Sequence, residues 1–595
     1  MGKSRRALAL AMATAFRADP WRSVGVLVAS TFAAIVGVLT AFWLKALVDA
    51  AADRDVDGTL VAALGIGLTV GLALMSRAMV TRMLFPLKEN TALYLDRRII
   101  ALVGGIPTVE HHERPEYLDR VEVLREEMDV LGFAGIHTAG ALALVVQVIL
   151  TGVLLASVNP LLLAVPLFAV PSLWAGARAE RIRQGALDTT ADQARRARQL
   201  FELTTSPAAG KELRIFGAGS ELLNRHRSDW TEVDRSRDRA LVRGLAWEAV
   251  SWLVFSAGYA AAIALVVDEA VSGGASVGDV VLALALVAQV NGQVSAAVGT
   301  VSQTVRTVKV AGRYLWLSDY ARSRRAAAEA PAPAPDRLTR GIDLQRVAFR
   351  YPGTTVDVLA QFDLFLPAGA TVAVVGDNGA GKSTLVKLLC RFYEPSEGVI
   401  TVDGTELGRI DIGEWRERMS AGFQDFTRFE LRAGQTIGIG DIHFVDDDEA
   451  IATALERAAS ADVVTALPEA METQLGASFD AGVELSGGQW QKLALARAMM
   501  RPAPLLLVLD EPTAALDSET EHTLFARYAA AASTLAARNG AITLLVSHRF
   551  STVRMADLIV VIDGGRIVGT GSHDELMAAG GLYAELYELQ ARSYR

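Results

Sequence analysis

Cysteine is almost absent from this chain, and so is any excess of basic charge. Cys390 is the single cysteine among 595 residues, which excludes an internal disulfide framework and a cysteine-based metal cluster. It falls in a predicted helix, where we expect a buried structural thiol. The net charge of -9 argues against a nucleic-acid binder, because such proteins normally carry a basic binding face.

Apolar residues, by contrast, make up 51% of the chain and gather in long blocks of its first half. A chain of this length exceeds one hydrophobic core, so two or more domains are expected. Segments of about twenty apolar residues are typical of membrane-spanning helices. About six such segments lie near Val24–Leu47, Leu60–Leu84, Phe133–Val158, Leu161–Ala175, Leu245–Val267 and Val277–Val298. Before them, residues 3–16 predict an amphipathic helix on the cytoplasmic membrane face rather than a cleaved signal peptide.

Basic and non-basic connections alternate between these predicted spans. Residues 49–57 are acidic apart from Arg54, and residues 157–160 carry no charge, whereas arginines and lysines gather at the opposite ends of the spans. The positive-inside rule therefore places both termini in the cytoplasm of a multi-pass protein of the cell membrane. Abundant alanine and arginine hint at a bacterial source with GC-rich DNA.

Long polar stretches at residues 82–129 and 178–239 predict helices that continue into the cytoplasm, broken around Glu113 and Arg214. The adjacent histidines His111 and His112 have no third or fourth ligand nearby, so a solvated turn is expected there rather than a metal site.

Polar residues inside the predicted spans are candidates for function because they are costly in a membrane. Lys45 is expected to snorkel or to sit at an interface between helices. The cluster Gln289, Asn291 and Gln293 predicts a polar cavity, with hydrogen bonding between helices as the alternative.

The most specific local pattern is a phosphate-binding loop of the form G-x-x-x-x-G-K-[ST]. An apolar strand-like run, residues 371–375, precedes it, and a helical run comes directly after it. The backbone N–H groups of such a loop surround phosphate oxygens at a helix N-terminus. Lys382 is expected to reach the β- and γ-phosphates, and Ser383 to hold Mg²⁺. The loop consists of Gly376, Asp377, Asn378, Gly379, Ala380, Gly381, Lys382, Ser383 and Thr384.

Beyond an Ala- and Pro-rich linker at residues 321–340, short β-rich runs alternate with helical ones. This alternation predicts an α/β domain over residues 341–595, after a helical membrane domain over residues 1–320. A continuous apolar strand, residues 505–509, ends in Asp510 and Glu511. Asp510 is expected to orient Mg²⁺, and Glu511 to polarise an attacking water.

Together with the phosphate loop, five further patterns resemble the ATP-binding cassette (ABC) family. The segment Leu485–Gln489 reads LSGGQ, which resembles the family signature. In the same way Tyr351 resembles the aromatic residue that stacks on adenine, Gln424 the glutamine that senses Mg²⁺ and water, Asp517 the D-loop aspartate and His548 the switch histidine. These elements occur in the family's order and extend over about residues 344–589, and the preceding membrane half resembles the exporter branch.

This resemblance implies an exporter-type half-transporter, in which an all-α transmembrane domain is followed by an α/β P-loop domain. ATP and Mg²⁺ are the implied ligands, and Glu511, His548 and Gln424 the implied catalytic group. Ser486, Gly487, Gly488 and Gln489 would meet an ATP held by another cassette, so a homodimer, or a heterodimer with a second half-transporter, is expected. The implied activity is ATP-driven export of an amphipathic or hydrophobic peptide, lipid or drug-like molecule.

Other classes of protein share parts of this pattern. An ATP-gated channel or regulatory membrane protein would use the same motor, and flux measurements in vesicles separate it from a pump. A soluble cassette protein acting on ribosomes or DNA would need tandem cassettes or a basic surface, and no spans. Importers of the family usually keep membrane and cassette parts on separate chains.

Overall fold

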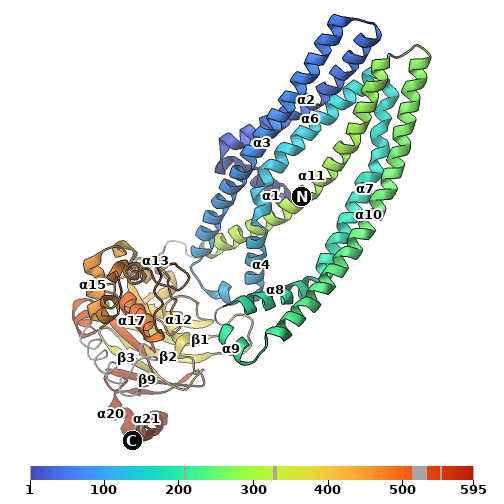
Figure 1. Ribbon diagram of the computed structural model, residues 1–595. Helices are drawn as coiled ribbons and strands as arrows, with labels where there is room; N and C mark the ends of the chain where they lie inside the picture. The colour runs from blue at the N-terminus through green and yellow to red at the C-terminus, as the bar shows by residue number, and fades with distance from the viewer. Residues whose placement is uncertain are drawn as a thin grey trace. The chain divides into compact units, whose positions relative to one another are not determined.

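The computed structural model describes residues 2–206, 209–325, 331–511, 532–547, 549 and 553–593 (Figure 1). The chain divides into two compact units. The first consists of Met1–Val103 and Asp119–Asp319, and the second of Gly104–Leu118 and Tyr320–Arg595. The short segment Gly104–Leu118 therefore belongs with the C-terminal half of the chain, although helices of the first unit lie on both sides of it in sequence.

The first unit is helical, and among its described residues six helical segments are long and apolar enough to cross a membrane. This confirms the six spans predicted from hydropathy. The six segments are α2 (Pro20–Ala52), α3 (Val56–Gly104), α6 (Ala134–Val158), η2 with α7 (Pro160–Ala164 and Val165–Thr189), α10 (Gly219–Val271) and α11 (Val277–Arg325). The shorter helices are α1 (Gly2–Ala18), α4 (Pro115–Glu126), α5 (Met128–Gly132), α8 (Ala191–Thr205) and α9 (Gly210–Ile215).

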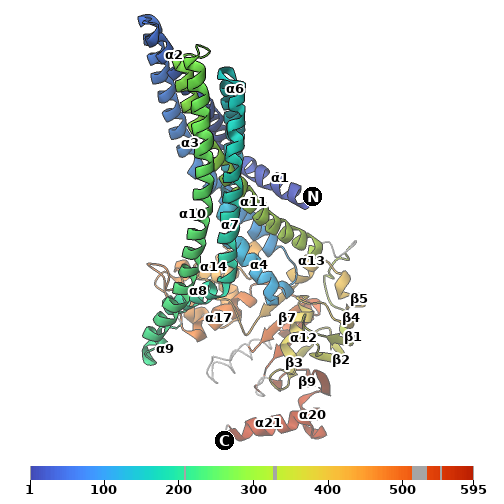
Figure 2. The ribbon, with the colours of Figure 1, turned by 90° about the vertical axis from the view of Figure 1, so that its right-hand side faces the viewer.

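Three of the spanning helices are much longer than a bilayer requires. The helices α3 and α11 have 49 residues each and α10 has 53. At 1.5 Å per residue each is about 75 Å long, whereas the hydrocarbon core of a membrane is about 30 Å thick. Their charged ends therefore extend beyond the membrane. Figures 1 and 2 both show α7 and α10 running side by side over much of their length.

Polar side chains within the spans tie α11 to its neighbours. Lys45 of α2 forms an ion pair with Asp279 of α11. The Gln293 Nε2 donates to Thr151 Oγ1 of α6 at 2.8 Å, and the Gln289 Nε2 donates to the Gly37 carbonyl of α2 at 3.4 Å. Lys45 therefore sits at an interface between helices, as expected. Gln289 and Gln293 take the alternative role of bonding helices together, because each finds an acceptor on a neighbouring helix.

Beyond the spans, the end of α4 and the short helix α5 form an acidic hub in the first unit. Three acidic residues lie within four positions of the chain, and each pairs with a base on a different helix. The pairs are Glu126 with Arg198 of α8, Glu127 with Arg313 of α11, and Asp129 with Lys88 of α3. The hub thus connects three helices through one short segment.

The described part of the second unit contains two sheets. The larger has the order β10-β9-β3-β8-β7-β6, in which β9, β3, β8, β7 and β6 are parallel and β10 is antiparallel. Its strands are β3 (Thr371–Val375), β6 (Met419–Gly422), β7 (Leu506–Asp510), β8 (Ile542–Val546), β9 (Leu558–Asp563) and β10 (Arg566–Gly571). The smaller antiparallel sheet has the order β2-β1-β4-β5. Its strands are β1 (Gly341–Phe349), β2 (Leu359–Pro367), β4 (Glu397–Val402) and β5 (Thr405–Glu406).

Helices surround these sheets and divide the interior into separate cores. One core lies between the two sheets around α12 (Lys382–Leu389) and includes Trp415 and the buried thiol Cys390. Another is built around α17 (Gly487–Ala498) and includes Trp490. The remaining described helices are α13 (Ile412–Glu417), α14 (Ala433–Gly438), α15 (Asp448–Arg457), α16 (Ala461–Thr465), α20 (His573–Ala579), α21 (Leu582–Ser593) and the 3-10 turns η1 (Glu110–Glu113), η3 (Leu407–Arg409), η4 (Ile442–Phe444) and η5 (Ala470–Glu472). The fold class predicted from the sequence is therefore confirmed.

Part of the predicted linker is bound to the second unit. The helix α11 continues to Arg325, and Ala332 then forms a parallel bridge with Ile410. The Ala332 N–H donates to the Arg409 carbonyl at 2.7 Å, and the Asp411 N–H donates to the Ala332 carbonyl at 2.8 Å. Residues 321–325 of the predicted linker thus belong to α11, whereas residues 331–335 lie outside helices and longer strands and pair with the second unit at Ala332.

The Lys45–Asp279 pair generates a test of how the spans are held together. We expect Lys45→Met to lower the unfolding free energy by about 1–3 kcal/mol, because Asp279 loses a charged partner while half-buried. The charge-exchanged double variant Lys45→Asp, Asp279→Lys should recover part of this loss. Thermal unfolding of the purified protein in one detergent measures both, and equal midpoints for wild type and Lys45→Met would contradict a stabilising pair.

Candidate nucleotide-binding site

Most of the predicted site residues lie at the carboxyl edge of the parallel sheet. The phosphate loop comes directly after β3, Gln424 comes after β6, Asp510 ends β7 and Glu511 directly follows it. Because β3, β8, β7 and β6 are successive parallel neighbours, their carboxyl ends meet at one edge. Residues that are almost 140 positions apart in sequence are brought together in this way.

The phosphate loop has the backbone that close approach to a ligand requires. Gly376 has φ +152° and Gly381 has φ +106°. A Cβ on Gly376 would lie 2.0 Å from the Ile562 carbonyl oxygen, so no side chain fits there. Asp377, Asn378, Gly379 and Ser383 are exposed at the loop, whereas Ala380 and Thr384 are buried. The backbone at Gly376 thus packs against β9, and the exposed part of the loop is formed by Asp377, Asn378, Gly379 and Ser383.

Lys382 at the start of α12 is buried against its own loop. Its Nζ donates to the Gly376 carbonyl at 2.7 Å and to the Asp377 carbonyl at 2.9 Å. Burial lowers the pKa of Lys382, and the nearby carboxylates of Glu511 and Asp510 oppose this shift only in part. A phosphate group close to Lys382 would compensate for the buried positive charge.

Asp510 is a buried carboxylate, only 6% exposed. Burial, with repulsion from Glu511 as a further cause, raises the pKa of Asp510 to about 6, while the Ser383 hydroxyl and Lys382 act in the opposite direction. A hard divalent cation prefers such a set of carboxylate and hydroxyl oxygens and completes its shell with phosphate and water. The residues Asp510 and Ser383 therefore fit Mg²⁺ well.

Glu511 and Gln424 are in direct contact at the sheet edge. The Gln424 Nε2 donates to Glu511 Oε2 at 2.7 Å. Glu511 has φ +46°, a left-handed conformation that costs a non-glycine residue energy, and its N–H donates to the Val546 carbonyl of β8 at 2.9 Å. This turn directs the Glu511 carboxylate away from β7 and toward the segment just after β6.

The signature residues open a different helix of the second unit. Ser486 caps α17 in a capping box, in which the Ser486 N–H donates to Gln489 Oε1 at 2.9 Å and the Gln489 N–H donates to Ser486 Oγ at 3.3 Å. A Cβ on Gly487 would meet only open space. Leu485 belongs to the core around α17, whereas Ala380 of the phosphate loop belongs to the core around α12. The signature turn and the phosphate loop thus sit on separate parts of the unit.

Two side chains of α17 reach toward the sheet edge, and sequence reasoning missed both. Gln491 is buried, and its Nε2 donates to the Glu511 carbonyl at 3.4 Å. At the other end of α17, the Arg497 Nη2 donates to the Thr427 carbonyl, three residues after Gln424, at 3.1 Å. Their proximity to the signature was the available signal, but the helix partners were not visible in the sequence.

The predicted adenine-stacking residue lies beside the phosphate-loop helix. The Tyr351 hydroxyl is 3.1 Å from Thr384 Oγ1, and the Lys387 Nζ sits 5.1 Å from the centre of the Tyr351 ring. Lys387 also forms an ion pair with Glu113 at 3.0 Å, and the Tyr393 hydroxyl donates to Glu113. A short series of contacts therefore runs from the segment between α3 and α4 to the side of the phosphate loop.

His111 corrects one expectation from the sequence. It is 1% exposed and packs against the rings of Tyr117 and Tyr320, so it does not lie in a solvated turn. The neighbouring His112 is exposed, and no cluster of potential metal ligands occurs in the described part of the chain. Burial, then repulsion from His112 and Arg324, lowers the pKa of His111 to about 4. The apolar and aromatic neighbours that bury His111 come from distant sequence positions.

Two of the predicted site residues, Asp517 and His548, lie outside the described residues. Of the remaining predicted residues, the structure gathers those on the phosphate loop, β6 and β7 at one edge, with Tyr351 beside Thr384.

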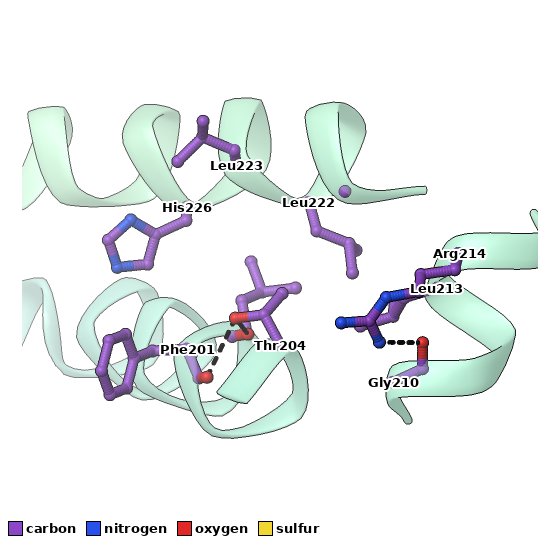
Figure 3. Close-up of a pocket in the computed structure, with 10 residues that line it drawn as sticks. Phe201, Thr204, Gly210, Leu213, Arg214, Leu222, Leu223 and His226 are labelled. Atoms are coloured by element: carbon purple, nitrogen blue, oxygen red, sulfur yellow. Dashed lines mark hydrogen bonds between the residues drawn. The ribbon is translucent and has the colours of Figure 1, made fainter. Parts of the chain in front are cut away.

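A separate cavity of about 660 Å³ lies in the first unit, at the break around Arg214. Figure 3 shows its lining from α8, α9 and α10, with Arg214 bonded to the Gly210 carbonyl at 2.8 Å and Phe201 facing His226. No residue predicted to bind nucleotide lines this cavity.

The comparisons with known proteins agree with this geometry. Residues 359–514 match the family described as "ABC transporter". In fold, the chain is similar to a bacterial Atm1-family ABC exporter with ATP bound, at a TM-score of 0.78 over 96% of this chain and 98% of the other, with 24% identity. Residues 359–514 thus match this family, and the fold of the chain is similar to that of the exporter. Its membrane helices and its cassette occur in one polypeptide.

Curated relatives resemble a part of the chain. The chain is 41% identical over 256 residues to an ATP-dependent lipid A-core flippase of Cupriavidus pinatubonensis, and 38% identical over 258 residues to that of Pseudomonas aeruginosa. These matches span 43% of this chain and 42% and 40% of the two relatives. The similarity therefore extends over less than half of each flippase.

The contact between Gln491 and Glu511 generates a test within the cassette. We expect Gln491→Leu to lower kcat for ATP hydrolysis about three- to tenfold, because the Glu511 backbone loses a hydrogen bond that positions it. The KM for ATP should stay nearly constant, since the Gln491 bond goes to the Glu511 backbone after β7 rather than to the phosphate loop after β3. Steady-state ATPase measurements separate the two parameters.

A neighbouring residue supplies the control. Lys492 lies on the same helix and pairs with Asp462 at 2.7 Å, so Lys492→Gln perturbs α17 without touching Glu511. An unchanged kcat in Gln491→Leu, or equal losses in both variants, would show that Gln491 has no positioning role.

His111 generates a pH test of the cassette unit. Its pKa is about 4 in the folded protein and 6.5 in the unfolded chain, so the unfolded state binds protons more readily between these values. Stability from this residue is complete above pH 6.5 and is lost as the pH falls toward 4, up to about 3 kcal/mol. Denaturant unfolding between pH 7 and 4, followed by tryptophan fluorescence, measures it. His111→Phe should flatten this decline, whereas His112→Phe should keep most of it, because burial is the larger cause of the lowered pKa. Identical profiles for the two variants would refute the assignment.

Proposed function

We propose that this protein is an ATP-driven exporter of an amphipathic or hydrophobic substrate, working as a dimer in the cell membrane of a bacterium. The observation that carries the proposal is the Gln424–Glu511 contact of 2.7 Å beside the buried Asp510, in one chain with six membrane-spanning helices. A carboxylate held next to a phosphate loop is the arrangement that ATP hydrolysis requires.

In the proposed reaction, Glu511 accepts a proton from water as the water attacks the γ-phosphorus of ATP. The bond from that phosphorus to the β,γ-bridging oxygen breaks, and ADP and inorganic phosphate are formed. Lys382 stabilises charge on the β- and γ-phosphate oxygens, and Gln424 holds the Glu511 carboxylate in place. His548 is proposed to contact the γ-phosphate, as the family resemblance implies.

Mg²⁺ held by Ser383, Asp510 and Gln424 would neutralise developing charge on the phosphates. Asp510 contributes the carboxylate, and its neighbour Glu511 remains available for water. The pKa of Asp510 is raised because its negative charge is unfavourable in this buried position. A bound cation would stabilise that charge.

A dimer completes the site. The signature turn and the phosphate loop belong to separate cores of one cassette. We therefore propose that Ser486, Gly487, Gly488 and Gln489 of one copy contact the ATP held by the other, with Tyr351 stacking on adenine and Asp517 at the shared interface. Because Glu511 and the full signature are both present, a homodimer has two competent sites, and a second half-transporter remains the alternative partner.

Transmission to the membrane helices is proposed to involve the segment between α3 and α4. Glu113 in this segment contacts Lys387 and Tyr393, and Lys387 lies over Tyr351. Closing of the cassettes on ATP would move this segment, and release of phosphate would return it. With both termini cytoplasmic, the cycle alternates access from the inner to the outer side of the membrane.

The cargo is proposed to be lipid-like or otherwise amphipathic. The flippases similar to part of this chain act on lipid A-core, according to their names, and the six spans are strongly apolar over their described residues. ATPase stimulation across a panel of lipids, peptides and drugs identifies the class.

The role of Glu511 is tested by Glu511→Gln. We expect ATP binding to be kept and turnover to fall by about 10²–10⁴, because the amide cannot accept the proton of water. ATPase assays and nucleotide binding on the same preparation provide the measurement. Near-normal turnover would contradict the assigned role.

Transport itself is measured in proteoliposomes. A pump accumulates substrate against its gradient in an ATP-dependent manner, and the Glu511→Gln protein serves as the inactive control. Dissipation of a gradient on ATP addition would instead indicate an ATP-gated channel.

A further inference from the structure

The first helix of the chain has an exposed surface that belongs neither to the nucleotide site nor to the spans. The sequence of α1 (Gly2–Ala18) contains four basic residues and no acidic one. Figure 2 shows α1 running sideways from the bundle of long helices toward the N-terminus, rather than along it. In this position α1 lies across the direction of the long helices, next to the N-terminal end of α2.

Small side chains fix α1 against the bundle. Ala7, Ala11 and Ala15 are buried, and they recur every four residues on one face of the helix. α1 packs against α6 and α2. A Cβ on Gly135 of α6 would lie 2.5 Å from the Ala15 Cβ, so glycine is needed there for this close approach. The buried face of α1 therefore packs against α6 and α2 and is not available to a ligand.

The other faces of α1 are apolar and basic. Met12 and Phe16 are 43% and 40% exposed, and Trp21 just after α1 is 84% exposed. Arg6 and Arg17 are exposed on the edge of the helix next to this apolar surface, and within the described residues neither forms an ion pair with a carboxylate. The nearest acidic residue in sequence, Asp19, is already bonded to Arg22 and to Asn90.

We infer that α1 binds anionic phospholipid headgroups of the leaflet in which it lies. Exposed apolar side chains beside unneutralised guanidinium groups match the boundary between acyl chains and negatively charged headgroups. Trp21 lies at the start of α2, a few residues before the apolar stretch of that helix. This position corresponds to the membrane–water interface, where tryptophan is enriched in membrane proteins. The inference rests on the proposed placement of the spans in a cell membrane.

Charge favours this ligand over a zwitterionic lipid. Each basic residue near an anionic membrane surface strengthens binding about fivefold. A guanidinium also forms paired hydrogen bonds to phosphate oxygens. Because α1 is fixed to α6 through the Ala15–Gly135 contact, a lipid bound there is held at a defined place on the protein.

The test uses the full-length protein in neutral detergent and a fluorescent phosphatidylglycerol whose anisotropy reports binding. We expect wild type to bind it, and Arg6→Gln with Arg17→Gln to bind about 25-fold more weakly. Arg6→Lys with Arg17→Lys should stay close to wild type, because the charge is kept. Arg195→Gln with Arg227→Gln removes two exposed arginines of α8 and α10 and should change nothing.

Unlabelled competitors identify the ligand. Phosphatidylglycerol should displace the probe, whereas phosphatidylcholine and glycerol 3-phosphate at equal concentration should not. Equal binding by the Arg6, Arg17 glutamine variant, or equal displacement by phosphatidylcholine, would overturn the inference. Displacement by glycerol 3-phosphate would overturn it too, because it would show a site for free phosphate rather than for a lipid.

ATPase activity of the same samples separates this inference from the proposed function. Wild type that hydrolyses ATP but shows no preference for phosphatidylglycerol would disprove the lipid site alone. Lipid binding that depends on Arg6 and Arg17, in a protein without ATPase activity, would leave the lipid site standing and contradict the proposed exporter.

Discussion

The parallel arrangement of β3, β8, β7 and β6 is the constraint on which the candidate site depends. Parallel strands end at the same edge of a sheet, so the residues just after one strand become neighbours of the residues just after the next. Gln424 and Glu511 meet at 2.7 Å because β6 and β7 are adjacent and in register from Met419 with Leu506 onward. Burial of these strands leaves Asp510 in an apolar setting, which raises its pKa.

Contacts away from that edge relate it to the rest of the second unit. The helix α17 begins with the signature turn and touches the Glu511 backbone through Gln491. On the other side of the phosphate loop, Lys387 joins Tyr351 to Glu113. These contacts connect the edge with two segments that are remote from it in sequence, one of which comes directly after α3.

The membrane half is held together by a different physical logic. Within a membrane there is no hydrophobic driving force between helices, because lipid tails are as apolar as their side chains. Close packing of small residues and polar pairs therefore determine which helices pack together. The Lys45–Asp279 pair, the Gln293–Thr151 bond and the close approach of Ala15 to Gly135 are contacts of this kind. In α1, the small residues Ala7, Ala11 and Ala15 face the protein, and the basic residues Arg6 and Arg17 are exposed.

The sequence alone determined the six spans, the α/β class and the phosphate loop, because each depends on local hydropathy or on a short motif. It also indicated that Glu511 and Gln424 matter, but it did not reveal that Gln491 contacts the Glu511 backbone. Only the tertiary structure decided that Gln289 and Gln293 bond helices together, that His111 is buried, and that the segment Gly104–Leu118 belongs with the cassette. The physical reason is that those outcomes depend on which distant segments pack against a residue, and a local pattern specifies a residue's own conformation but not its partners.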